Sequence, residues 1–142
     1  MRTRGMRAVL ATSLMWMAAV ALKAQVVVII SAQNPISRLE PSQISEIFLG
    51  QTKTFFTGGM AVPLDQPEGS AIRKTFYEKL TGKNPAQLKA YWSRLTFSGT
   101  AQPPASLAND QAVVKEVASN PKYIGYVDKS AVNPSVKIVM AL

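Results

Sequence analysis

Residues 61–76, AVPLDQPEGSAIRKTF, constrain the fold most, because they predict a strand, a loop and a helix in succession. Apolar residues recur every four positions after the loop, at Ile72, Phe76 and Leu80. That interval places their side chains on one face of a helix. The loop therefore brings the flexible Gly69 and the hydroxyl that follows it to the start of a helix.

The start of this helix is a candidate site for a small oxyanion. The first N–H groups of a helix have no partner within it, and the helix dipole adds partial positive charge. Ser70 supplies a hydroxyl there, and Arg73 supplies a cation in the first turn. The alternative is an ordinary capped helix, in which Ser70 bonds to its own backbone. The residue spacing leaves both interpretations open.

Residues 1–24 have the pattern of a secretory signal peptide. Three arginines precede an apolar run over residues 8–22, and a small residue, Ala24, stands before Gln25. The run is shorter than the about 20 residues that a membrane span requires. We expect cleavage before Gln25, a mature domain over residues 25–142, no stable membrane insertion afterwards, and a periplasmic or secreted location. The alternative is an uncleaved anchor.

The composition narrows the function classes. Four of the 16 basic residues and none of the eight acidic ones lie in residues 1–24, so the remainder carries +4 rather than +8. This removes most of the support for nucleic-acid binding and mildly favours anionic partners. The chain has no His and no Cys, which excludes imidazole and thiol catalysis and the usual zinc sites. Loop solvation explains the pair Asp65 and Glu68, so we expect no enzyme, no cofactor and no metal.

The other elements complete an α/β pattern. A β-branched run over residues 25–31 suits a strand buried on both faces, and further strands are predicted over residues 123–127 and 136–140. The residues between 97 and 107 are predicted to form a loop. Three more helices are predicted to begin at the caps Glu40, Asn84 and Asn109. The order β-α-β-α-α-α-β-β predicts a single mixed-sheet α/β domain.

Two positions carry specific packing predictions. Trp92 belongs to an amphipathic stripe over residues 88–95, so we expect it in the core; the alternative is a binding platform with Tyr91. Gly125 lies inside a predicted strand, where glycine indicates a close approach of backbone by a neighbouring element.

Five segments resemble motifs of the phosphate ABC-transporter substrate-binding proteins, which are PstS-like, type 2 periplasmic binding proteins. The segments are NP at 34–35, IFLGQ at 47–51, EGSAIRKTF at 68–76, YWSRLTFSG at 91–99 and PKYIGYV at 121–127. They follow the family's order over essentially all of residues 25–142. The resemblance implies a single mixed-sheet domain similar to one lobe of this two-lobed family.

The resemblance also implies a ligand site. Its residues here are Glu68, Gly69, Ser70, Ala71 and Arg73. Glu68 keeps a carboxylate that can accept a proton from a protonated oxyanion. The family's leading arginine is replaced by Gln66 and its final threonine by Ile72, so a bidentate arginine clamp is lost unless Arg73 reaches round.

Two functions follow from the resemblance. The first is an exported domain that binds phosphate or another small oxyanion weakly, or that serves phosphate uptake as an accessory. A two-lobed site with a micromolar Kd has a binding free energy of about −8 kcal/mol. If one lobe supplies half of the contacts, the Kd is near millimolar. The alternative is a non-catalytic interaction module that has kept the fold, lost the ligand and binds an envelope or transporter protein.

Overall fold

The computed structural model describes residues 24–142; residues 1–23, and with them the expected signal peptide up to its last residue, lie outside the described part. The described chain forms β1 (Val26–Ser31), α1 (Pro41–Phe48), β2 (Val62–Asp65), α2 (Ala71–Thr81), α3 (Pro85–Phe97), β3 (Ala105–Ser106), α4 (Asp110–Ser119), β4 (Tyr123–Asp128), a 3-10 turn (Lys129–Ala131) and β5 (Val136–Ala141). The predicted order is correct except for β3, a two-residue strand inside the stretch that was predicted as loop.

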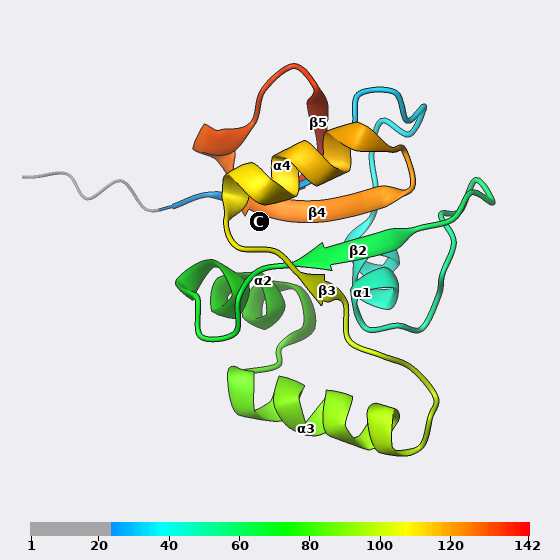
Figure 1. Cartoon of the computed structure of the whole chain (residues 1–142), viewed down its shortest axis with the longest axis vertical. Coiled ribbons are helices and arrows are strands. Elements are labelled where there is room, and N and C mark those ends of the chain that lie inside the picture. Colours follow the sequence, from blue (N-terminus) through cyan, green and yellow to red (C-terminus); the bar gives the residue numbers. More distant parts are fainter. Residues whose placement is uncertain (1–23) are drawn as a thin grey trace, which may run out of the picture.

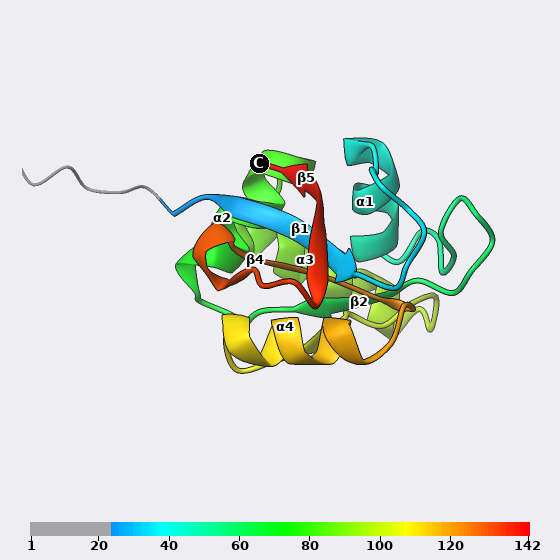
Figure 2. The ribbon, with the colours of Figure 1, turned by 90° about the horizontal axis from the view of Figure 1, so that it is seen from above.

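The strands form one mixed sheet in the order β3-β2-β4-β1-β5, which confirms the predicted fold class. β2 is parallel to both β3 and β4, whereas β1 is antiparallel to both β4 and β5. Helix α4 covers one face of the sheet, and α1, α2 and α3 lie on the other (Figures 1 and 2). The domain therefore has three layers, with a hydrophobic core on each side of the sheet.

Strand β1 is the centre of both cores. All six of its residues are buried, as its uninterrupted β-branched sequence predicts. Successive side chains of a strand point to opposite faces. Val26, Val28 and Ile30 accordingly pack in the cluster with α1, α2 and α3, while Val27 and Ile29 pack with α4.

The predicted helix caps are present. Asn84 Oδ1 accepts a hydrogen bond of 2.9 Å from the N–H of Gln87, and Asn109 Oδ1 accepts one of 2.9 Å from the N–H of Ala112. Glu40 is the N-cap of α1, with proline at the first helical position. The two asparagine side chains satisfy their helix starts, and at α1 the N–H of Glu40 donates to Oε1 of Gln43 at 2.8 Å. These bonds are local, which is why the sequence predicts the boundaries well.

At Gly125, α4 packs closely against the sheet. A Cβ atom added there would lie 2.6 Å from Cγ1 of Val113 on α4, so only glycine leaves room for that side chain. The close approach predicted for this strand glycine is confirmed.

Trp92 lies in the core, with 6% of its surface exposed. The far edge of its indole packs against the turn after α1: a Cβ atom added to Gly50 would lie 3.3 Å from Cη2 of Trp92. Gly50 itself has φ of 72°, a conformation that favours glycine. Trp92 thus joins α3 to the rest of the domain.

We predict that Trp92→Ala lowers the free energy of unfolding by about 3–5 kcal/mol, because the substitution empties a large core site. Denaturant unfolding measures the change. Phe97→Ala is the matched control on the same helix: Phe97 is 96% exposed, so its loss should stay within about 0.5 kcal/mol. A loss below about 1 kcal/mol for Trp92→Ala would contradict its role in the core.

Candidate functional site

The sequence-predicted site residues lie together in the loop after β2 and in the first turn of α2. Ser70 is the N-cap of α2, and Ala71 is its first residue. Gly69 has φ of 84°, in the left-handed region, so glycine is required for the chain to turn into the helix. The turn at Gly69 therefore places the loop backbone next to the start of α2, where both line the cavity described below.

A cavity of about 260 Å³ lies between α2 and the start of α3. Four of the five predicted residues line it, together with five that the sequence did not single out. The lining consists of Gly69, Ser70, Ala71, Arg73, Lys74, Tyr77, Lys83, Pro85 and Leu88. Glu68 does not line it; that carboxylate faces a neighbouring groove of about 490 Å³, which shares Arg73 with the cavity.

Ser70 does not cap its own helix through its side chain. Its Oγ atom is buried and has no hydrogen-bond partner within residues 24–142, and no side-chain cap bond is formed. An unpaired buried hydroxyl is costly, so it identifies a place where a ligand atom would be favourable. This geometry disfavours the interpretation of α2 as an ordinary helix capped by Ser70 Oγ.

The backbone at the start of α2 offers fewer free donors than the sequence suggested. The N–H of Ser70 donates to the carbonyl of Pro67 at 3.0 Å and is not free for an anion. The N–H groups of Ala71, Ile72 and Arg73 have no acceptor among the described residues. An anion at this end of the cavity would therefore meet Ala71 and the residues after it, rather than the N–H of Ser70.

Arg73 is held in place by a buried carboxylate. Its Nε atom lies 3.4 Å from Oδ2 of Asp65, and its guanidinium lies 5.3 Å from the centre of the Tyr77 ring. The side chains of Arg73 and Asp65 are 16% and 3% exposed. Arg73 is thus oriented before any ligand arrives, but part of its charge is already compensated by Asp65.

The expectation that Asp65 is solvated in a loop is wrong: it ends β2, is 2% exposed and is the centre of a buried polar network. Its carboxylate accepts hydrogen bonds from the hydroxyl of Tyr77 at 2.8 Å, from the hydroxyl of Tyr126, and from the N–H of Gln66 at 2.8 Å, besides the contact with Arg73. A buried charge persists only when it is paired and hydrogen-bonded in this way. The network ties β2, α2 and β4 together beneath the cavity.

Burial raises the pKa of Tyr77 well above its usual value of 10.0, and the adjacent Asp65 charge raises it further. The same two causes, burial first, raise the pKa of Tyr126. Both hydroxyls therefore keep their protons at all physiological pH values. They serve as donors to Asp65 and are excluded as general bases.

Gln66 stands where the resembled family has its leading arginine, and it points into the protein. It is 2% exposed, and its Nε2 atom donates to Oδ1 of Asp110 at 2.8 Å and to the carbonyl of Tyr126 at 3.2 Å. Gln66 does not line the cavity. Its amide instead fastens the end of β2 to α4 and β4.

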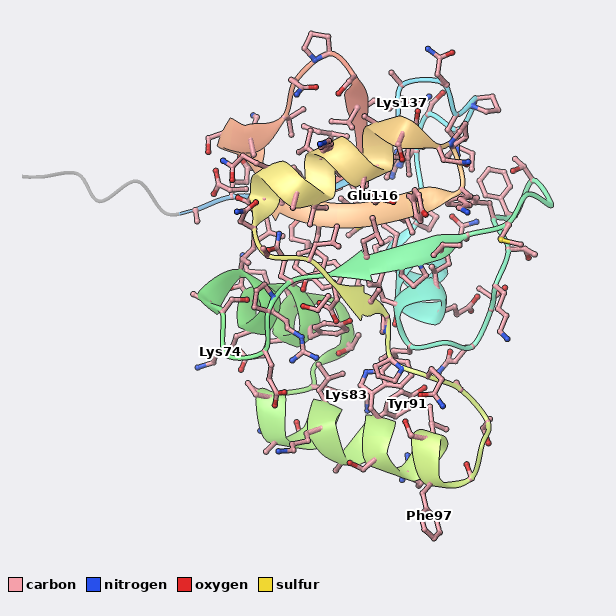
Figure 3. All side chains as sticks on the ribbon, in the orientation of Figure 1. Lys74, Lys83, Tyr91, Phe97, Glu116 and Lys137 are labelled. Atoms are coloured by element: carbon pink, nitrogen blue, oxygen red, sulfur yellow. The ribbon has the colours of Figure 1, made fainter. Side chains whose placement is uncertain are left out.

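Sequence analysis missed two cations of the cavity. Lys74 lines it from α2, and Lys83 lines it from the connection to α3; both are labelled in Figure 3. The Nζ atom of Lys83 lies 5.2 Å from the ring centre of Tyr91. Lys74 follows Arg73 directly and could have been inferred, whereas Lys83 is brought near only by the tight turn at Gly82, which has φ of 72°.

Within residues 24–142, no three Asp or Glu side chains gather where they could hold a metal ion. None of the helices in this part of the chain is long and apolar enough to span a membrane.

Comparison with solved structures identifies the class of fold. No protein-family model and no curated protein sequence matches the chain. A candidate phosphate ABC transporter substrate-binding protein from Clostridium perfringens, solved with bound phosphate, superposes with a TM-score of 0.63 and 22% identity, over 82% of this chain and 44% of that one. An ABC-type phosphate transport receptor from Vibrio cholerae gives 0.64 and 16%, over 82% and 46%. PstS from Borrelia burgdorferi gives 0.60 and 12%, over 82% and 46%.

The chain therefore has the fold of about one lobe of the phosphate ABC transporter substrate-binding proteins. It spans less than half of the length of each of these structures. At such low identity, the likeness establishes the fold and does not extend to the ligand.

We predict that stability falls above pH 10. The hydroxyls of Tyr77 and Tyr126 have raised pKa values in the folded protein, but in the unfolded chain they ionise at about pH 10. Their contribution to stability is therefore fully present below pH 10 and is lost as the pH rises above it. Each such tyrosine adds a slope of about 1.4 kcal/mol per pH unit. Denaturant unfolding between about pH 9 and pH 11 measures it.

Tyr77→Phe provides the control for this slope. It removes one of the two titrating hydroxyls and leaves Asp65 with Tyr126, Gln66 and Arg73 as donors. The difference in slope between the variant and the parent isolates the contribution of the Tyr77 hydroxyl. Equal slopes would show that Tyr77 ionises normally in the folded protein.

Proposed function

We propose that the chain is an exported, non-catalytic domain that binds phosphate or a similar small oxyanion weakly at the start of α2. The observation that carries this proposal is the buried, unpartnered Oγ of Ser70, which lies beside unpaired N–H groups and the pre-oriented Arg73. Backbone N–H groups, a hydroxyl and an arginine are the donors that proteins use for phosphate. Likeness to phosphate transport receptors supports the same chemistry.

The charge around the cavity favours an anion. Arg73, Lys74 and Lys83 all line it, and no carboxylate does. Asp65 lies behind Arg73 and takes up part of its charge, which lowers the affinity below that of three free cations. Within the described residues the cavity is also open to solvent and therefore to screening by salt. We expect a Kd near millimolar, about −4 kcal/mol.

The proposed partners are phosphate or another small oxyanion and, for an accessory role in uptake, a transporter protein of the envelope. Nucleic acid is not among them, since much of the apparent basicity lies in residues 1–24. The alternative function, an interaction module for an envelope protein, has one observation in its favour. Phe97 at the end of α3 is 96% exposed and points away from the domain (Figure 3).

We predict that Arg73→Ala weakens phosphate binding more than tenfold, because a charge-assisted hydrogen bond contributes about 1.5–3 kcal/mol. Ser70→Ala should weaken binding less, and it should leave α2 intact because Ser70 Oγ forms no cap bond. Titration with phosphate and sulfate, followed by amide shifts in NMR, measures both, and added salt should weaken binding.

Lys79→Ala is the matched control for this titration. Lys79 is an exposed cation on α2 that lines none of the cavities described above, so its removal tests the effect of net charge alone. Shifts confined to residues 69–73 would support the site. If tens of millimolar phosphate produced no shift there, the interaction module would become the better account.

The proposed export is tested separately. We predict that the mature protein begins at Gln25, because basic, apolar and small residues follow one another over residues 1–24. Mass spectrometry of the intact protein from the periplasm or medium gives the N-terminus. Ala24→Leu should block cleavage by replacing the small residue at the cut. An unprocessed chain in the membrane fraction of the parent would favour the uncleaved anchor.

A further inference from the structure

We infer that the cavity at the start of α2 is shaped for an organic phosphate, namely a phosphate monoester or a phosphonate with a small apolar substituent. This ligand class deepens, and rests on, the proposed function of the same site. The reason is that the two ends of the cavity have unlike chemistry, and inorganic phosphate complements only one of them.

The polar end lies at the start of α2. Ser70 Oγ is buried there without a partner, and the N–H groups of Ala71 and Ile72 have no acceptor in the described part of the chain. Arg73 adds an oriented guanidinium, fixed through Nε by Asp65. All of these groups are donors, and they suit the negatively charged oxygens of a phosphate head.

The opposite end, at the start of α3, presents apolar side chains beside the cation of Lys83. Leu88 is 2% exposed and Pro85 opens α3, so both present apolar wall to the cavity. Tyr77 lies about one turn beyond Arg73 on α2, about 10 Å along the helix axis from Ser70. Its hydroxyl already donates to Asp65 at 2.8 Å and is not available to donate to a ligand.

The volume of the cavity separates inorganic phosphate from a substituted one. If each oxygen takes about 30 Å³, the share of a water molecule in the liquid, then inorganic phosphate occupies roughly 120 Å³. The cavity holds about 260 Å³, so inorganic phosphate alone does not fill it, and Pro85 and Leu88 belong to its lining. A small apolar substituent fills that space, and each buried CH₂ tightens binding about fourfold.

A series of phosphonates with one head and a growing tail tests this ligand class. Methylphosphonate, propylphosphonate and phenylphosphonate, with inorganic phosphate as the reference, are titrated into the full chain by NMR. Propylphosphonate should bind at least about fourfold more tightly than methylphosphonate, and up to about 15-fold if both added CH₂ groups are buried. Its shifts should extend from residues 69–73 to Pro85's neighbours and Leu88.

Two variants locate the tail. Pro85→Ser makes the apolar end polar, and Leu88→Val makes it smaller without emptying it. Each should reduce the advantage of propylphosphonate over methylphosphonate by about threefold and leave methylphosphonate binding within about twofold. Pro134→Ser is the control, since Pro134 is an exposed proline that lines none of the described cavities. Retained amide spectra show that each variant is folded.

The outcomes distinguish failure of the organic ligand class from failure of the proposed oxyanion binding. If phosphate shifts residues 69–73 but affinity is flat or falls as the tail grows, the organic ligand is excluded and the oxyanion site stands. The organic ligand is equally excluded if Pro85→Ser and Leu88→Val leave the propyl advantage unchanged. If neither phosphate nor any phosphonate produces shifts at tens of millimolar, both proposals fall together.

Discussion

The rest of the structure depends on the buried carboxylate of Asp65. A charge that is 3% exposed is tolerable only because Tyr77, Tyr126, Gln66 and Arg73 all supply donors to it. Asp65 ends β2, and its partners come from the next residue, from α2 and from β4, so one carboxylate links α2 to two strands of the sheet. The same contact with Arg73 sets the orientation of the cation at the mouth of the cavity. Stability and the candidate site therefore share one set of hydrogen bonds.

This coupling explains why the candidate site differs from the arginine clamp of the resembled family. Gln66 occupies the position of that arginine and is turned inward, where its amide joins Asp110 and the backbone of Tyr126. The nearest cation in sequence, Arg73, reaches back to the same strand end through Asp65. An anion here would depend on a partly compensated cation, on backbone N–H groups and on the hydroxyl of Ser70. Such a site is suited to weak binding, and its apolar end leaves room for more than a phosphate head.

The fold could be predicted from sequence wherever the signal was local. The run in β1 is β-branched without interruption, and it is buried on both faces. Asn84 and Asn109 cap the helices that they were predicted to cap, because a cap is decided within about four residues. The short β3 escaped prediction because its two residues form a strand only by pairing with Leu64 and Asp65 of β2. Its extended backbone is stabilised by a strand distant in the sequence, which leaves no local pattern.

By itself, the sequence determined the α/β class, the position of the loop before α2, the burial of Trp92 and the need for glycine at position 125. Each of these depends on a pattern among residues that are close together in the sequence, such as an apolar period, a helix cap or a glycine within a strand. Only the tertiary structure decided the chemistry of the site. Tyr126 and Tyr77 meet at Asp65 although they lie 61 and 12 residues from it, and Lys83 reaches the cavity only because the chain reverses at Gly82. Donors and charges act through distances in space, and those distances exist only after β2, α2 and β4 have packed together.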